Sequence, residues 1–264
     1  MRRSRSATAA TEVAAEIRRP LRVLTLNIQV GMPTAHYGHY VTGAWRHVLP
    51  SKSVQRNLDR IAELAADFDV VALQEADAGS LRTAQINQIE YLARRAGFAH
   101  WRAAINRDLG PFAQHALGFL SRHALHDVRH HPLPGRFPGR GALEAHIREH
   151  GHAPLHLMVA HLALGRVSRG RQLDYLAALA DPEADTVLMG DFNCEPLELS
   201  RHPELRRIGF RLLHETPTYP SWRPVRSIDH MLVTPSVQTR GGHVLDAKLS
   251  DHLPVATEIR LRPQ

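Results

Sequence analysis

A carboxylate and an amide follow one of the most apolar runs of the sequence. Residues 187–189, Val-Leu-Met, are typical of a buried strand, and Asp191 and Asn193 come soon after them. We expect both side chains at the rim of a site, because strands carry their chemistry where the chain leaves the sheet. In an extended backbone the two side chains point the same way and can bind a metal ion, a phosphate or an attacking water. The same residue types also form tight turns, so this segment alone leaves both interpretations open.

Polar side chains stand at the ends of other apolar segments as well. We interpret as strands residues 21–28, 70–73, 116–122, 143–147, 155–162, 187–189, 228–233 and 255–259. The polar residues at or beside these ends are Asn27, Glu75, His161, Asp191, Asn193, Asp229, Asp251 and His252. Taken singly, each has an ordinary structural explanation, such as a cap, a turn, a surface charge or a buried histidine. Only the whole ordered set argues for a site.

Three segments with helical spacing of apolar residues alternate with these strands. They are residues 54–67, with Ser53 as the expected N-cap, residues 85–96, which end before Gly97, and residues 168–180. Strands and helices in alternation, with several hairpin-like strand pairs, predict an α/β layered sandwich. No internal repeat or linker divides the sequence. We therefore predict one domain over residues 21–264, preceded by a disordered basic arm at residues 1–20.

The composition favours an anionic binding partner but does not identify which one. The chain has 264 residues and a formal net charge of +7, which suits nucleic acid or an anionic lipid surface. Nearly all the positive charge is arginine, since Lys52 and Lys248 are the only lysines, and the arginines are spread along the chain. No apolar run approaches the ~18 residues of a membrane span. Because Cys194 is the only cysteine, no intrachain disulfide can form, and we expect a monomer in the reducing cytoplasm.

Six segments carry a family resemblance. They are LTLNI, VVALQEAD, MVAHL, LMGDFNCEP, SIDHMLV and LSDHLPVATEI. In this order they resemble the successive motifs of the endonuclease/exonuclease/phosphatase superfamily, which has the fold of deoxyribonuclease I. The resemblance spans about residues 21–261, and a full ordered set of motifs arises by chance far less often than one motif. It implies a four-layer αββα sandwich of two packed, mostly antiparallel sheets flanked by helices, with the site at one rim.

The resemblance also implies a metal-dependent phosphoester hydrolase. A catalyst for this reaction must neutralise phosphate charge, orient a nucleophile and stabilise the leaving alkoxide. Glu75 matches the principal Mg²⁺ ligand of the family, Asn27 is expected to help hold the metal site, and Asp251 to add a contact directly or through water. Such hard oxygen ligands suit Mg²⁺, and we expect Mn²⁺ to substitute for it.

Five further positions match residues to which the family assigns the chemistry. Asp191 resembles the carboxylate that orients or deprotonates the attacking water, and Asn193 resembles the amide that contacts the phosphate. His252 is expected to face the phosphate, while Asp229 binds its other ring nitrogen and holds it protonated. His161 resembles a histidine that lies near the leaving group in the lipid and deoxyribonuclease branches.

Two segments bear on the substrate. Residues 218–224, TYPSWRP, resemble bacterial hydrolases and sphingomyelinases more than nucleases, and Gln29 stands where apurinic endonucleases usually carry an acidic residue. We therefore predict a small or lipid-like phosphoester as substrate. The long segment 29–52, with Tyr37, Tyr40 and Trp45, is either a lid over the site or a surface loop. A DNA or RNA endonuclease on the same fold, favoured by the charge, and a catalytically silent basic binding module are the alternatives.

One motif competes with this interpretation. His146, Glu149 and His150 match the H-x-x-E-H pattern of zinc sites, which needs a helix to bring both histidines to the metal. The apolar residues of this segment alternate instead of following helical spacing, and Gly151 comes directly after it. We therefore predict a strand and a hairpin turn here rather than a zinc site.

Overall fold

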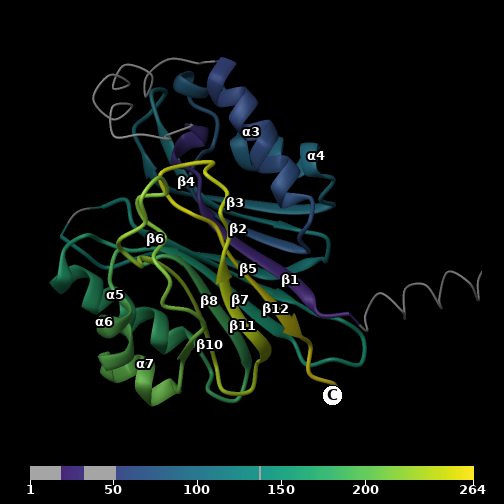
Figure 1. The fold of residues 1–264 in the computed structure, drawn as a ribbon, viewed down its shortest axis with the longest axis vertical. Helices are drawn as coiled ribbons and strands as arrows, with labels where there is room; N and C mark the ends of the chain where they lie inside the picture. The colour runs from purple at the N-terminus through teal and green to yellow at the C-terminus, as the bar shows by residue number, and fades with distance from the viewer. Residues whose placement is uncertain (1–18, 33–51, 137) are drawn as a thin grey trace, which may run out of the picture.

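The computed structural model of the protein describes residues 19–32, 52–136 and 138–264. Almost all of the predicted N-terminal arm lies outside the described residues, and so do Tyr37, Tyr40 and Trp45 of the predicted lid. The described chain forms two six-stranded sheets packed face to face, with helices on both outer faces (Figure 1). The predicted αββα sandwich is confirmed.

The first sheet has the strand order β11-β12-β1-β2-β4-β3. Its strands are β1 (Leu21–Asn27), β2 (Val70–Asp77), β3 (His100–Asp108), β4 (Gln114–Ser121), β11 (Gln238–Val244) and β12 (Val255–Arg260). β1 and β2 run parallel, and every other neighbouring pair in this sheet is antiparallel. The ends of the parallel pair therefore meet at one edge of the sheet.

The second sheet has the order β5-β6-β7-β8-β10-β9. Its strands are β5 (Leu125–Pro132), β6 (Gly141–Ile147), β7 (Leu155–His161), β8 (Asp185–Asp191), β9 (Arg211–Leu212) and β10 (Asp229–Val233). Here β7 and β8 form the parallel pair, and the remaining pairs are antiparallel. Each sheet thus contributes one parallel pair to an otherwise antiparallel arrangement.

The helices divide between the two outer faces (Figure 1). On the first sheet lie α3 (Lys52–Ala65) and α4 (Gln88–Ala96), and on the second lie α5 (Arg166–Leu179), α6 (Pro196–Arg201) and α7 (Pro203–Ile208). Two short 3₁₀ turns, η1 (Gln29–Gly31) and η3 (Leu81–Thr83), follow strands of the first sheet. Within the described residues, we find no helix that is both long and apolar enough to cross a bilayer.

Strand alternation in the sequence produces three buried apolar layers. Along β1, Val23 joins the core between the sheets, whereas Leu24 and Leu26 face α3 and α4. Along β8, Val187 and Met189 enter the central core and Leu188 faces the helices of the second sheet. Because both faces are covered, these strands are apolar almost throughout, which is why their sequences stand out.

The structure corrects several predicted elements. β3, β5 and β11 are absent from the predicted strands because at most one residue of each is buried, and polar residues such as arginine and histidine break up their apolar positions. α4 begins at Gln88 rather than Gln85, since Asn87 caps it by accepting hydrogen bonds from two backbone N–H groups. Ser53 lies inside α3 instead of capping it. Elements exposed to solvent are therefore the ones that apolar patterns miss.

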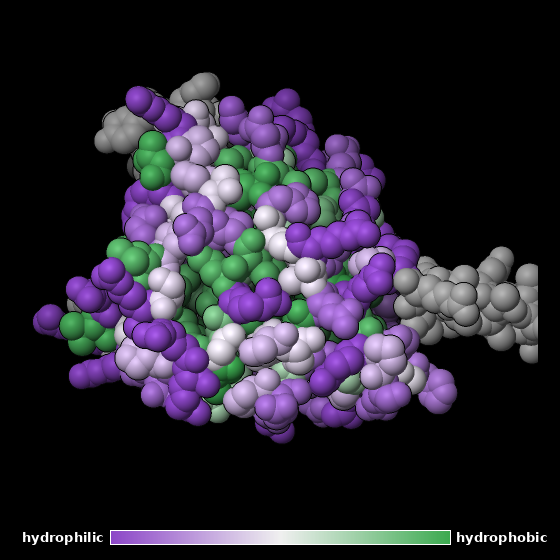
Figure 2. All heavy atoms as spheres, turned by 60° about the horizontal axis from the view of Figure 1, so that its bottom comes forward, coloured by the Kyte–Doolittle hydropathy of each residue, from purple (hydrophilic) through white to green (hydrophobic). Residues whose placement is uncertain are grey.

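The surface mixes charged and apolar side chains. On the face shown in Figure 2, hydrophilic side chains cover most of the outline, and hydrophobic ones show between them towards the middle. The exposed large hydrophobic residues come from several parts of the chain and include Phe112, Leu164, Val167 and Val225. Scattered exposure of this kind is normal for a globular protein.

Candidate active site

Strand register brings the predicted polar residues to one rim of the sandwich. On the second sheet, Asp191 at the end of β8 pairs with His161 at the end of β7 and with Asp229 at the start of β10. On the first sheet, Asn27 ends β1, and its amide Nδ2 donates to Asp191 Oδ2 at 3.1 Å. The two sheets therefore meet at Asp191, where their parallel pairs end.

Glu75 reaches this rim through a distortion within β2. The sequence places Glu75 beyond a strand that ends near residue 73, but β2 continues to Asp77. The register with β4 shifts between Leu73 and Ala76, and Glu75 has a φ of 53°, which is unusual for a residue with a side chain. Such a bulge re-aims one side chain, and here it turns the half-buried carboxylate of Glu75 towards the rim.

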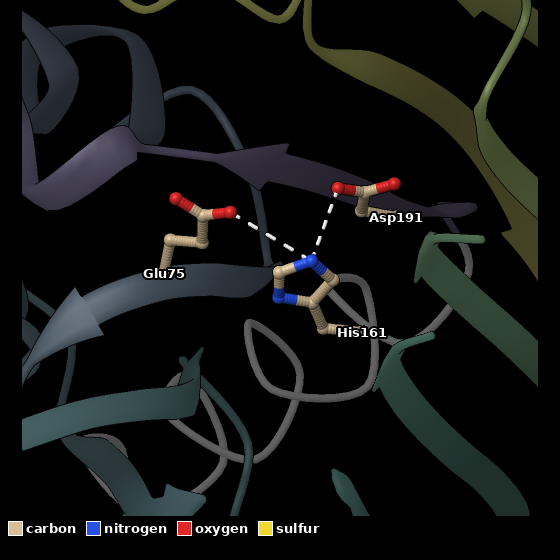
Figure 3. Close-up of side chains that lie close together, drawn as sticks. All are labelled: Glu75, His161 and Asp191. Carbon is tan, nitrogen blue, oxygen red and sulfur yellow. Dashed lines mark ion pairs between the residues drawn. The ribbon is translucent and has the colours of Figure 1, made fainter. Parts of the chain in front are cut away.

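Glu75, His161 and Asp191 form the first of two clusters (Figure 3). The His161 Nε2 atom lies 3.4 Å from Asp191 Oδ2 and 3.7 Å from Glu75 Oε1. Arg140, just before β6, places its Nη1 atom in hydrogen-bonding contact with the same His161 nitrogen. Two carboxylates and a guanidinium thus converge on one imidazole nitrogen.

Asp191, Asp229 and His252 form the second cluster. The His252 Nδ1 atom lies 2.8 and 2.9 Å from the two carboxylate oxygens of Asp229. Thr218 Oγ1 donates to Asp229 Oδ2 at 2.6 Å, and the ring of Tyr219 lies 4.9 Å from that of His252, centroid to centroid. The predicted contact between Asp229 and His252 is therefore present, and Nε2 is the ring nitrogen that Asp229 does not bind.

Burial and charge set opposite protonation states for the two histidines. Burial would lower the pKa of His252, but the charge and hydrogen bond of Asp229 outweigh it and raise the pKa well above 6.5. Burial lowers the pKa of His161 well below 6.5, and the charge of Arg140 acts in the same direction. At neutral pH, His252 is therefore a cation, and neutral His161 can accept a hydrogen bond from Arg140.

Asp191 carries a strongly perturbed carboxyl group at the rim. Burial raises the pKa of Asp191 to about 7, and the charges of Asp229 and Glu75 act in the same direction, against that of His252. Asp191 Oδ1 accepts a hydrogen bond from the backbone N–H of Asn193 at 3.0 Å. A carboxyl group with a pKa near neutrality is suited to accepting a proton.

Two predicted site residues, Asn193 and Asp251, belong to neither of the two clusters. Asn193 donates its side-chain Nδ2 to the carbonyl of Leu162 at 3.0 Å, so in this geometry its amide nitrogen ties two loops together. Asp251 belongs to neither cluster, and its Oδ1 atom lies 4.0 Å from His252 Nε2. Ser250 holds this segment in place, since its Oγ donates to the carbonyl of Asn27 at 2.6 Å.

Arg140 and Thr218 are the residues that sequence reasoning missed. Arg140 lies in a segment rich in glycine and proline, Pro134–Gly141, whose composition predicts only a loop. Thr218 opens the TYPSWRP segment, and a lone threonine gives no signal of a buried bond to Asp229. Neither residue could be placed in the site without the three-dimensional arrangement.

The segment that matches the zinc motif is a strand, as its alternation predicts. His146 lies on β6 and stacks on His156 of β7, with ring centroids 4.5 Å apart. Glu149 and His150 follow the strand, and Glu149 Oε1 lies 2.6 Å from His123 Nδ1. The helix that an H-x-x-E-H zinc site requires is absent from this described segment.

The chemistry of the rim residues fits a divalent cation. Glu75, Asp191 and Asp251 offer carboxylate oxygens and Asn27 offers an amide oxygen, which are the ligand types that Mg²⁺ prefers. The neighbouring carboxylates repel one another, as the raised pKa of Asp191 shows together with its burial. A bound cation would relieve that repulsion, so the donor set suits such an ion.

The rim combines a buried carboxyl group with a neutral-range pKa, a cationic histidine and carboxylates that suit a cation, which are the groups that phosphoryl-group hydrolysis needs. The family model described as Endonuclease/Exonuclease/phosphatase family matches residues 24–252, and the chain belongs to this family. Its members hydrolyse phosphoesters. Among curated protein sequences, none matches this chain significantly.

Solved structures share the fold across nearly the whole chain. An endonuclease/exonuclease/phosphatase from Beutenbergia cavernae is 24% identical, with a TM-score of 0.73 over 93% of this chain and 72% of that one. The mannosyl-6-phosphatase Bt3783 of Bacteroides thetaiotaomicron is 16% identical, with a TM-score of 0.65 over 90% and 99%. A humanized D. rerio TDP2 is 18% identical, with a TM-score of 0.66 over 90% and 98%. At such identities the likeness concerns the fold.

Proposed function

We propose that the protein is a Mg²⁺-dependent phosphoester hydrolase that acts on a small or lipid-like phosphoester. The observation that carries the proposal is the position of Asp191, which belongs to both rim clusters and carries a pKa near neutrality. It has a cationic histidine on one side and the Glu75 carboxylate on the other. This combination offers a proton acceptor, a positive charge for phosphoryl oxygens and a cation site in one place.

Each residue of the candidate site has its own role in the proposed reaction. Asp191 accepts the proton of the attacking water, and the amide of Asn27 fixes the orientation of its carboxylate. His252 presents Nε2–H to the phosphoryl oxygens, while Asp229 keeps the ring charged and oriented. Neutral His161, beside Arg140, lies on the leaving-group side, and the amide of Asn193, which also bonds the carbonyl of Leu162, contacts the phosphate.

Glu75, Asn27 and Asp251 are the residues proposed to hold the metal. When bound, Mg²⁺ neutralises phosphate charge and supports the leaving oxygen, and Mn²⁺ can replace it. The bulge in β2 aims the Glu75 carboxylate at the rim, where it can bind the metal. We also keep as proposals that the protein is monomeric, that it works in the cytoplasm and that its surface can contact lipid.

A panel of phosphodiesters, phosphomonoesters, phospholipids and supercoiled DNA, each with added Mg²⁺, tests the proposal. We expect turnover of at least one small or lipid phosphoester, and its loss after chelation. Nicking of supercoiled DNA without turnover of the small esters would favour the endonuclease alternative, which the net charge of +7 supports. Absence of turnover on the whole panel would contradict the proposal and favour a binding module.

Glu75→Gln tests the metal assignment. The substitution keeps the shape but removes the charge, so we expect a rate loss of at least ~10²-fold with an unchanged melting temperature in chelator. The matched control is Glu63→Gln, which alters an exposed glutamate on α3 away from the rim. Full activity of Glu75→Gln would show that this carboxylate does not hold the metal.

A further inference from the structure

A cleft of about 530 Å³ opens beside the candidate active site. Glu75, Arg140 and His161 line the side that it shares with the rim clusters. The cleft continues beyond them to Arg107 on β3, to the loop before β6, and to residues 163–165 and 168 around the start of α5. Its size is within the usual range of small-molecule sites. It therefore provides room for a part of the substrate that lies beyond the scissile phosphoester.

The lining of this cleft is strongly positive. Arg107, Arg136 and Arg140 line it, and the only carboxylate among its lining residues in the described chain is Glu75, which the proposed function assigns to the metal. Among the described ion pairs, neither Arg107 nor Arg140 contacts a carboxylate. Burial lowers the pKa of Arg140, the charges of Asp191 and Glu75 oppose this, and the charge of Arg107 adds to it. Cations gathered in this way stabilise a bound anion.

The side chain of Arg107, the arginine farther from the rim, lies against the loop on the opposite wall. Gly139 has a φ of 104°, and a Cβ atom added there would lie 2.9 Å from Cδ of Arg107. Because Gly139 has no side chain, the side chain of Arg107 can lie against it. The same loop is tied to α5, since the backbone N–H of Arg136 donates to Ser168 Oγ at 3.5 Å. The positive lining is therefore part of a built cleft that three segments of the chain enclose.

We propose that this cleft binds a second phosphate group of the substrate, and that Arg107 is its main specificity-determining residue. The inference rests on the proposed function and narrows its substrate class to small bisphosphorylated molecules. The phosphate to be cleaved occupies the rim between Glu75 and His252, and the second phosphate lies beyond Arg140, towards Arg107. Walls from both sheets and from α5 favour a compact substrate over an extended polynucleotide.

Paired substrates that differ by one phosphate test the inference. Steady-state kinetics with Mg²⁺ would compare fructose 1,6-bisphosphate with fructose 6-phosphate, and adenosine 3′,5′-bisphosphate with adenosine 3′-monophosphate. We expect the wild type to prefer a bisphosphate, and Arg107→Gln to raise the KM for it about tenfold at an unchanged kcat. KM changes alone because Arg107 holds the second phosphate equally before and during the reaction. Monophosphate kinetics should not change, and Arg107→Lys should retain part of the effect.

The control is Arg102→Gln, which removes a guanidinium from the same strand but outside the cleft. Equal preference of the wild type for both members of each pair would overturn the inference. So would an Arg107→Gln variant whose KM for every substrate matches that of the wild type. Arg107-dependent preference for a DNA oligonucleotide over both bisphosphates would overturn the assignment to small molecules.

Calorimetric titration in chelator separates this inference from the proposed function. Without metal no turnover is expected, and the two bisphosphates should still bind the wild type about tenfold more tightly than Arg107→Gln. Such binding together with absent turnover of all esters in Mg²⁺ would contradict the proposed function and leave the anion subsite supported. Equal affinities of wild type and Arg107→Gln would overturn the subsite even if the enzyme hydrolyses phosphoesters.

Discussion

A His–Asp contact at the rim and a His–Glu contact on the second sheet hold their histidines, His252 and His156, in opposite charge states. At the rim, His252 binds Asp229 through Nδ1. A separate group of residues away from the rim, here called the outer cluster, comprises His131, Glu144, His146 and His156 on β5, β6 and β7. In the outer cluster His156 Nε2 lies 3.2 Å from Glu144, which resembles the contact at the rim.

The difference lies in what surrounds each imidazole. Around His252, the carboxylates of Asp229, Asp191 and Asp251 outweigh burial, and the pKa is raised well above 6.5. Around His156, burial comes first and the stacked His146 adds to it, so that the pKa falls to about 4 despite Glu144. His252 is therefore a cation because three carboxylates surround it, whereas the one carboxylate beside His156 does not offset burial.

This contrast explains why residue types alone are a poor guide to a site. Both clusters contain histidine and acid at short spacing, and the outer one even includes part of an H-x-x-E-H pattern. At neutral pH, however, a neutral His156 and the single carboxylate of Glu144 form only an ordinary hydrogen bond. The rim supplies a cation next to several carboxylates, which is the arrangement that phosphate chemistry needs.

Replacing each histidine gives the largest expected difference between the clusters. His252→Ala should lose about 10²- to 10³-fold in kcat with little change in KM, because its charge acts on oxygens that become more negative in the transition state. His156→Gln should leave both constants unchanged. Steady-state kinetics of the two purified variants on one phosphoester would measure this. A similar loss in both would show that the clusters do not differ in function.

The outer cluster should instead govern acid stability. Folded protein keeps His156 neutral down to about pH 4, whereas the unfolded chain takes up this proton near pH 6.5. The unfolded state therefore binds more protons between these values, and the contribution of His156 is fully present above pH 6.5 and is lost as the pH falls towards 4. A shift of this size corresponds to about 3 kcal/mol.

Urea unfolding at pH 7 and pH 5 would measure this effect. His156→Gln should flatten the fall in unfolding free energy between the two pH values, since glutamine does not titrate. The matched control, His150→Gln, changes an exposed histidine just beyond β6 and should keep the wild-type pH dependence. An equally steep fall in His156→Gln and wild type would place the acid sensitivity elsewhere.

How well the sequence predicts an element depends on whether the element is buried or exposed. Strands such as β7 and β8 are buried on both faces, so their apolar runs and the polar residues at their ends stand out. β5, which carries His131 of the outer cluster, is largely exposed and has no apolar run to reveal it. Apolar patterning therefore finds the elements that position the site and overlooks the edges of the sheets.

Some residues of the candidate site could be predicted from the sequence, and others could not. Asp191 and His161 follow predictable strands, and ordered motifs indicate their common rim. Arg140 could not be predicted, because it lies in a glycine- and proline-rich loop and reaches His161 only through the pairing of β6 with β7. The bulge that aims Glu75 also leaves no local signal, since the sequence predicts a strand that ends near residue 73, whereas β2 continues past the bulge to Asp77.

Asp229→Asn tests whether the Asp229 carboxylate keeps His252 charged, and we expect a smaller rate loss than for His252→Ala. Asparagine keeps the shape of Asp229 but removes the charge that opposes burial around His252. With that charge gone, the imidazolium gives up its proton at lower pH, so the alkaline limb of the kcat profile should move down by about 1–3 pH units. At pH values below this limb the rate loss should be smaller than that of His252→Ala, because the imidazole is still protonated there.

A pH–rate profile of wild type and Asp229→Asn on one phosphoester would measure both the position of the alkaline limb and the rate loss. The matched control is Asp174→Asn, which alters an exposed aspartate on α5. An alkaline limb at the wild-type position would mean that Asp229 does not set the charge of His252.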